Sequence, residues 1–125
     1  MDWSQYPNFK KEEFICKHTG KIYMHPEFMT VLQAIRTEYA KPMHITSGYR
    51  DRKHPIEAKK LTPGEHEKGC AADIKVSGED AIKLIGIAIK HGIRRIGIQQ
   101  KGLGRYIHLG MGDQLSKFPP AIWTY

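Results

Sequence analysis

The sequence contains few cysteines and no long apolar run. Cys16 and Cys70 are the only cysteines among 125 residues, too few and too far apart for the disulfide framework of a small secreted domain. No apolar run approaches the roughly 20 residues of a membrane-spanning helix. The opening MDWSQYPNF lacks the basic and apolar regions of a secretory signal. We therefore expect a protein without a membrane span that is synthesised in the cytoplasm with both cysteines as thiols.

The sequence also lacks repeats, low-complexity linkers and long runs of like charge. We therefore expect residues 1–125 to form a single domain. The net charge of +7 is a reason to consider nucleic-acid binding. However, the basic residues are scattered in pairs, such as Lys59 with Lys60, and form no recognised binding motif. No nucleic-acid partner is expected, and a basic surface would equally suit another polyanion, such as a bacterial cell wall.

Hydrophobic periodicity and turn residues predict an α+β fold. Ser77 followed by Asp80 matches a capping box, and Gly92 suits the end of the helix that follows. In chain order we expect a helix at 25–40, a strand within 42–50, an exposed loop at 51–65, a strand at 71–76, a helix from Ser77 to Gly92 and a hairpin of strands at 94–99 and 105–111. This order predicts a small, mostly antiparallel sheet with helices packed on one side.

One short stretch, GEHEKGCAADI at 64–74, is rich in side chains that bind metals. It does not fit the helical H-E-x-x-H zinc motif, because Cys70 stands where the second histidine belongs. Gly69 also disfavours a helix at this point, at a cost of roughly 1 kcal/mol against alanine. We therefore expect His66 on a loop and Asp73 on the strand that follows.

A third candidate ligand, His108, lies in the last predicted strand between Ile107 and Leu109. Side chains alternate along a strand, so His108 points away from these two neighbours and toward a cleft if they face the core. A catalytic zinc site commonly takes three nitrogen or carboxylate ligands and leaves a fourth position for water. His66, Asp73 and His108 would supply that set, although a simple hydrogen-bonded strand histidine is the alternative for His108.

Four segments in the same order resemble the peptidase family M15, which contains zinc D-Ala-D-Ala carboxypeptidases and peptidoglycan endopeptidases. His66, Gly69, Ala71 and Asp73 fit its H-x-x-G-x-A-x-D pattern. ITSGYRDRKH at 45–54 is similar to its S-G-Y-R segment, RRIGIQQKGLGRYIHLG at 94–110 to its closing segment, and FKKEEFICKHTG at 9–20 to the start of its compact single-domain members. The resemblance implies the fold shared by hedgehog-type and DD-peptidase domains, with Zn²⁺ bound by His66, Asp73 and His108.

The resemblance also suggests roles for residues around the metal. Arg50 resembles the arginine that faces the substrate, where it holds a peptide carboxylate or supports charge on the attacked carbonyl; a surface ion pair is the alternative. Tyr106 lies two residues before His108 in the strand, so its side chain points to the same face and could donate a hydrogen bond to an oxyanion. Glu67 is expected to be a solvated loop charge, and Cys70 a buried thiol rather than a ligand.

The sequence departs from the family pattern around the proton-transfer group. Arg105 stands three residues before the last ligand, where many members have a carboxylate, and Tyr106 stands where others have a histidine. Leu109 and Gly110 replace the valine and aspartate that often follow the ligand, and Gly64 replaces a serine. Asp113 is the nearest downstream carboxylate and would have to turn back to reach the site. No general base is therefore assigned from the sequence.

These observations favour a zinc metallopeptidase that hydrolyses peptidoglycan stem peptides, as a carboxypeptidase or an endopeptidase. Without a secretion signal, it would act on the cell wall after release, as a phage-type endolysin does. The alternative is a non-catalytic, zinc-containing module of the same scaffold that binds the cell wall or belongs to a virion. The residues do not indicate whether D-Ala-D-Ala, L-Ala-D-Glu or another bond is cut, nor the oligomeric state.

Overall fold

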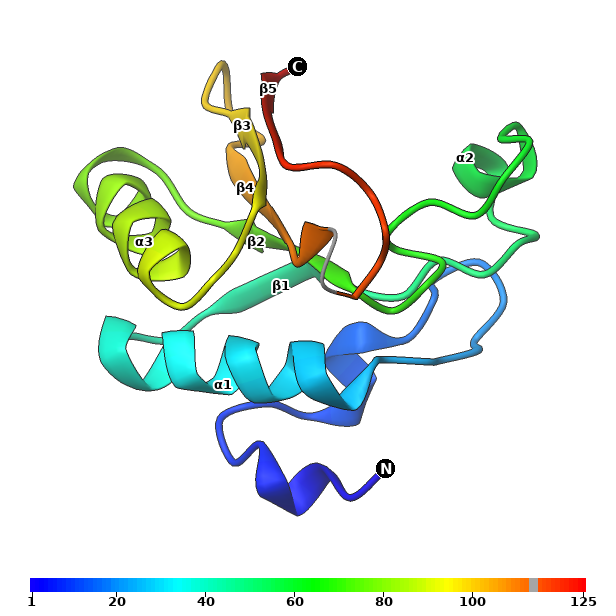
Figure 1. The fold of residues 1–125 in the computed structure, drawn as a ribbon, viewed down its shortest axis with the longest axis horizontal. Helices are drawn as coiled ribbons and strands as arrows, with labels where there is room; N and C mark the ends of the chain where they lie inside the picture. The colour runs from blue at the N-terminus through cyan, green and yellow to red at the C-terminus, as the bar shows by residue number, and fades with distance from the viewer. Residues whose placement is uncertain (113–114) are drawn as a thin grey trace.

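The computed structural model describes residues 1–112 and 115–125, in which a five-stranded sheet is combined with helices (Figure 1). The elements in chain order are the 3-10 helices Trp3–Gln5 and Lys11–Phe14, α1 (Pro26–Tyr39), β1 (His44–Ser47), α2 (Pro55–Ala58), β2 (Ala71–Lys75), α3 (Gly78–Lys90), β3 (Arg95–Gln99), β4 (Tyr106–Gly110) and β5 (Ala121–Thr124). The fold is α+β, as the sequence predicts.

The sheet has the strand order β1-β2-β4-β3-β5 and is mostly antiparallel. The predicted hairpin is confirmed as β3 and β4, with Gly97 opposite His108. Strand β5 was not predicted, and it adds to the edge of the sheet in parallel with β3. It has only four residues, and most of them are exposed, so it lacks the regular alternation by which a strand is recognised in a sequence.

Helices α1 and α3 lie beside each other against the sheet and bury the core (Figure 1). In α1, Phe28, Leu32 and Ile35 are fully buried, which is the helical spacing that predicted this helix. In β4, Ile107 and Leu109 face the same core and are also fully buried. Strand alternation then turns the intervening side chains toward the opposite face of the sheet. The expected direction of the His108 side chain is therefore confirmed.

The start of α3 differs from the expected capping box. Ser77 is the N-cap residue, but its side chain makes no capping hydrogen bond. Asp80 is instead bound by Lys41, with 2.6 Å between Nζ and Oδ1, and Gly78 enters the helix with a left-handed φ of +63°. The end of the helix is as expected, because Gly92 adopts a φ of +93° that favours glycine.

The segment at 51–65 is not the wholly exposed loop that its composition suggests. It contains α2, in which Glu57 is fully buried, and it ends at the buried Glu65. Both carboxylates are paired with basic residues: Glu57 with Lys60 at 3.1 Å and Glu65 with Arg95 at 2.7 Å. Polar composition predicted exposure here, but paired charges can be buried.

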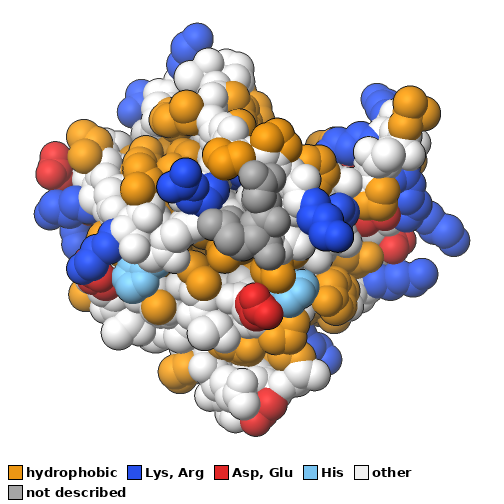
Figure 2. Space-filling model, viewed as in Figure 1, with side chains coloured by type: hydrophobic (Ala, Val, Ile, Leu, Met, Phe, Trp, Pro, Cys, Tyr) orange, Lys and Arg blue, Asp and Glu red, His pale blue; other side chains and the backbone are white. Residues whose placement is uncertain are grey.

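Charge is distributed over the molecule without one dominant region on the face that Figure 2 shows, where Lys and Arg side chains form separate groups. None of the helices in residues 1–112 and 115–125 combines the length and the hydrophobicity that a membrane span requires.

Candidate metal centre

His66 lies on the turn that precedes β2, and two contacts define its position. Gly69 makes this turn with a φ of +71°, and a Cβ added there would lie 2.6 Å from the Tyr23 carbonyl oxygen. Nδ1–H of His66 donates a hydrogen bond to the Gly48 carbonyl, at 2.7 Å. Nε2 therefore retains its lone pair, and it lies 3.5 Å from Oδ1 of Asp73. The expectation that His66 lies on a loop and not in a helix is confirmed.

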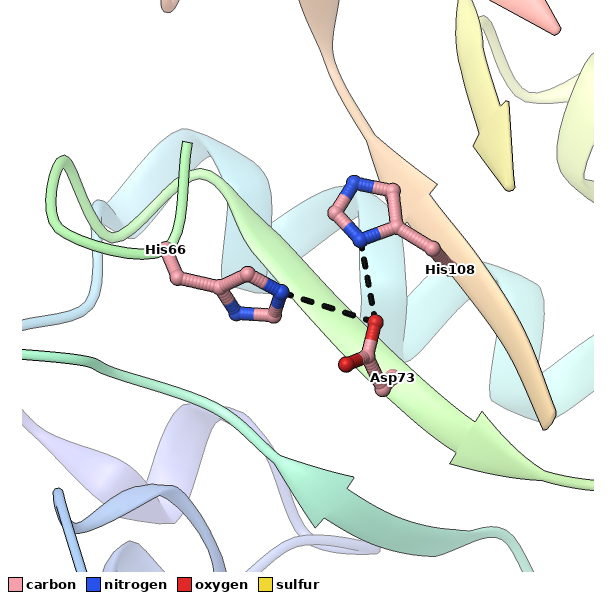
Figure 3. A group of neighbouring side chains, drawn as sticks. All are labelled: His66, Asp73 and His108. Carbon is pink, nitrogen blue, oxygen red and sulfur yellow. Dashed lines mark hydrogen bonds and ion pairs between the residues drawn. The ribbon is translucent and has the colours of Figure 1, made fainter. Parts of the chain in front are cut away.

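Asp73 and His108 face each other directly across β2 and β4. Nδ1 of His108 lies 2.9 Å from Oδ1 of Asp73, so both histidines direct a ring nitrogen at the same carboxylate (Figure 3). One donor atom from each of His66, Asp73 and His108 lies within 4.8 Å of the other two. All three residues are buried, with 4–5% of their surface exposed. The stretch that holds His66 and Asp73 thus converges with the distant strand β4 to form a group that could bind a metal ion.

The charge states within this group suit a divalent cation. Burial opposes ionisation of Asp73, but its hydrogen bond with His108 and the adjacent His66 ring outweigh this effect and hold its pKa well below the usual range. Burial lowers the pKa of His66, so its imidazole is neutral near pH 7. Burial also opposes the charging of His108, yet its bonds to Asp73 and Glu65 raise its pKa. A metal ion would replace the Nδ1 proton of His108.

Glu65 is a member of this site that the sequence analysis did not identify. Its Oε1 lies 3.0 Å from Nε2 of His108 and 2.7 Å from Nε of Arg95. The pKa of Glu65 is lowered, because these bonds outweigh the effect of burial. The only signal in the sequence was a carboxylate adjacent to His66, and its partners lie 30 and 43 positions away.

Arg50 lies beside the metal-ligand group. Its guanidinium is 3.5 Å from Oδ2 of Asp73 and 3.6 Å from Oε2 of Glu57. Only 18% of its side chain is exposed. The ion pairs formed by Arg50 therefore lie inside a cleft rather than on the open surface that the alternative interpretation assumed.

The cleft above the group has a volume of about 630 Å³. Tyr106 and His108 both line it, as the alternation of side chains along the strand predicts. Burial and a hydrogen bond with Tyr125 raise the pKa of Tyr106, so its phenol remains a hydrogen-bond donor at neutral pH. Half of the remaining lining residues are basic or aromatic: Arg50, Lys60, Arg95, Phe118, Trp123 and Tyr125.

The other residues considered from the sequence have clear positions, with one exception. Glu67 is not a solvated charge, because it pairs with Arg52 at 3.1 Å and its side chain is mostly buried. Cys70 is a buried thiol, as expected, and burial raises its pKa to about 11. Arg105 is exposed and donates to the Gly102 carbonyl at 3.0 Å. Asp113, the downstream carboxylate, lies outside the described residues.

Comparison with protein families identifies the family of the chain. The model of a family described as Peptidase M15 matches residues 7–110. This range contains His66, Asp73 and His108 and ends with the last residue of β4, so β5 and its aromatic side chains lie beyond it. No curated protein matches the chain.

Proposed function

Because the chain belongs to the peptidase M15 family, we propose that it is a zinc-dependent peptidase that hydrolyses peptide bonds of peptidoglycan. One observation carries the proposal: donor atoms of His66, Asp73 and His108 converge within 4.8 Å beside an open cleft that His66 and His108 line. Two imidazoles and one carboxylate are a common ligand set of catalytic zinc. The proposed place of action is the cell wall, reached after release of the protein from the cytoplasm.

The residues around the cleft have separable roles in this proposal. His66, Asp73 and His108 would hold the ion, which supplies Lewis acidity toward a carbonyl group and a water molecule. Tyr106 remains protonated and faces the cleft, so it can donate a hydrogen bond to a developing oxyanion. Arg50 orients the substrate through a carboxylate of the peptide. When a substrate carboxylate binds, it competes with the long contacts of Arg50 to Asp73 and Glu57.

The composition of the cleft wall favours an acidic peptide as substrate. Arg50, Lys60 and Arg95 are cationic, and Trp123 and Tyr125 add aromatic surface. Peptidoglycan stem peptides carry free carboxylates, which suits such a wall. Whether the enzyme acts as a carboxypeptidase or as an endopeptidase depends on how far a peptide can extend past these side chains.

The second candidate function is a non-catalytic zinc module that binds the cell wall. It is favoured by the exposed Arg105, which occupies the position of the family's carboxylate and bonds only to the nearby Gly102 carbonyl among the described residues. Both functions require the same metal centre, so metal binding alone does not distinguish them.

The decisive experiment is incubation of the purified protein with defined muropeptides, followed by mass spectrometry of the products. We expect cleavage at one type of peptide bond, its loss on treatment with a chelator and its return on addition of zinc. His66→Ala should abolish both cleavage and zinc binding, while His44→Ala, which removes an exposed imidazole in β1, should change neither. A zinc-loaded protein that binds cell walls but leaves every muropeptide intact would favour the non-catalytic module.

A further inference from the structure

Glu65 has no role in the mechanism above, although it is buried at the floor of the cleft. Only 7% of its surface is exposed. Its Oε1 accepts two hydrogen bonds, from Arg95 and from Nε2 of His108. Its Oε2 is buried without a hydrogen-bond partner among the described residues. A buried carboxylate is costly to maintain, so this position calls for a physical explanation.

Gly110 provides the space that Glu65 occupies. A Cβ built on Gly110 would collide with Oε2 of Glu65. Gly110 has an ordinary φ, and no left-handed backbone conformation requires glycine at this position. The Glu65 carboxylate can therefore occupy this space only because residue 110 in β4 has no side chain.

Arg95 holds Glu65 in place and is itself held by aromatic rings. Its guanidinium lies 5.2 Å from the Phe118 ring and 5.1 Å from the Trp123 ring. Trp123 in β5 also packs against the ring of His108, with 5.1 Å between centroids. Its indole fills the space above Gly97, where an added Cβ would lie 2.7 Å from it. The segment that follows the family match thus contacts both the third ligand, through Trp123, and the arginine that holds Glu65.

We propose that Glu65 is a positioning residue for the metal ligand His108. The ionised carboxylate accepts the Nε2–H of His108, which fixes the ring orientation and leaves Nδ1 as the nitrogen that would bind a metal ion together with Asp73 and His66. Removal of the carboxylate from such a pair commonly weakens metal binding by about 10- to 100-fold. This inference rests on the proposed metal function. The Glu65 carboxylate contacts Nε2 of His108, whereas Asp73 contacts Nδ1. Glu65 therefore supports a metal ligand and does not act on the reacting atoms.

The test is the zinc affinity of the full chain, measured by competition with a chromophoric chelator, which does not depend on activity. Glu65→Ala should weaken zinc binding by about 10- to 100-fold, and Glu65→Gln should have a smaller effect because an amide oxygen still accepts a hydrogen bond. Glu67→Ala is the matched control. It removes a nearby carboxylate that pairs with Arg52 and should leave the affinity within about twofold.

A rescue variant separates positioning from a general loss of structure. In the double variant Glu65→Gly with Gly110→Asp, a carboxylate enters the same space from β4, so much of the lost zinc affinity should return. Long-range ¹H–¹⁵N spectra should show Nε2 of His108 protonated in the zinc-bound wild type and in the rescue variant. A folded Glu65→Ala variant with wild-type zinc affinity would overturn the inference, and so would a rescue variant that binds no better than Glu65→Ala.

The outcomes also separate this inference from the proposed function. A wild-type protein that binds zinc but cuts no muropeptide refutes the peptidase, while the loss of affinity in Glu65→Ala still supports the role of Glu65. An active peptidase whose zinc affinity does not respond to Glu65→Ala refutes only the role of Glu65. A wild-type protein that binds no zinc refutes both.

Discussion

Replacement of Gly69 by alanine should destabilise the protein more than the same replacement at a glycine with a similar backbone conformation. Gly69 has a φ of +71° and Gly20 a φ of +74°. An L-residue in this left-handed region costs roughly 1–2 kcal/mol, and that cost is common to both positions. Their surroundings differ: nothing lies within 4 Å of a Cβ added at Gly20, whereas one added at Gly69 would lie 2.6 Å from the Tyr23 carbonyl oxygen and 3.0 Å from the His25 nitrogen.

The difference between the two variants therefore isolates the steric clash. The atoms that a Cβ at Gly69 meets include backbone atoms, which cannot rotate away as a flexible side chain could. Overpacking of this kind costs about 1–3 kcal/mol. The clash would also strain the hydrogen bond from His25 N to Gly69 O, which is 2.9 Å long. We expect a loss of about 1–2 kcal/mol for Gly20→Ala and of about 2–5 kcal/mol for Gly69→Ala.

Urea unfolding of the chelator-treated proteins, followed by circular dichroism, measures both losses without a contribution from bound metal. The zinc affinity of Gly69→Ala should also fall, because Gly69 connects the turn of His66 to the strand of Asp73. Equal free energies of unfolding for the two variants would refute the steric argument, and the glycine at 69 would then reflect backbone conformation alone.

Four further predictions concern the metal centre and its surroundings. First, zinc at 100 times its dissociation constant should stabilise the wild type by about 2.7 kcal/mol and raise its melting temperature by roughly 10 °C, whereas Asp73→Asn should show little rise in the same thermal scan. Second, the lowered pKa values of Asp73 and Glu65 mean that the unfolded chain binds more protons than the folded one in acid. The chelator-treated protein should therefore lose stability as the pH falls below about 5, and urea titrations that show constant or rising stability toward pH 3 would contradict this. Third, Tyr106→Phe should reduce kcat by about 100-fold with little change in KM, because the phenol acts on a developing charge; steady-state kinetics that show a change in KM alone would instead assign Tyr106 to substrate binding. Fourth, in a Cys16→Ser variant, the buried Cys70, with its pKa raised to about 11, should react with a disulfide reagent at pH 8 only after addition of urea; rapid reaction of the native variant would refute its burial.

Features that repeat along the chain were readable from the sequence. Apolar residues at helical spacing predicted α1, because one face of a helix must be buried for the helix to pack. Strand alternation placed His108 opposite Ile107 and Leu109, and the structure confirms it. The spacing of residue types around His66 and Asp73 resembled the M15 pattern, and the family match over residues 7–110 agrees with that.

Features that depend on contacts between distant segments were decided only by the tertiary structure. The sequence marked Ser77 as part of a capping box, but Asp80 pairs with Lys41, which lies 39 positions away. Glu65 lies at the end of the segment that the sequence predicted to be an exposed loop, and its burial depends on Arg95 and His108. Gly110 had no evident reason to be glycine before that carboxylate filled its space. Strand β5 has no periodicity of its own and forms because the edge of β3 is available to pair with it. Helical spacing and strand alternation involve residues that are close in the sequence, so they can be recognised there. The partners of a buried charge depend on how the whole chain packs.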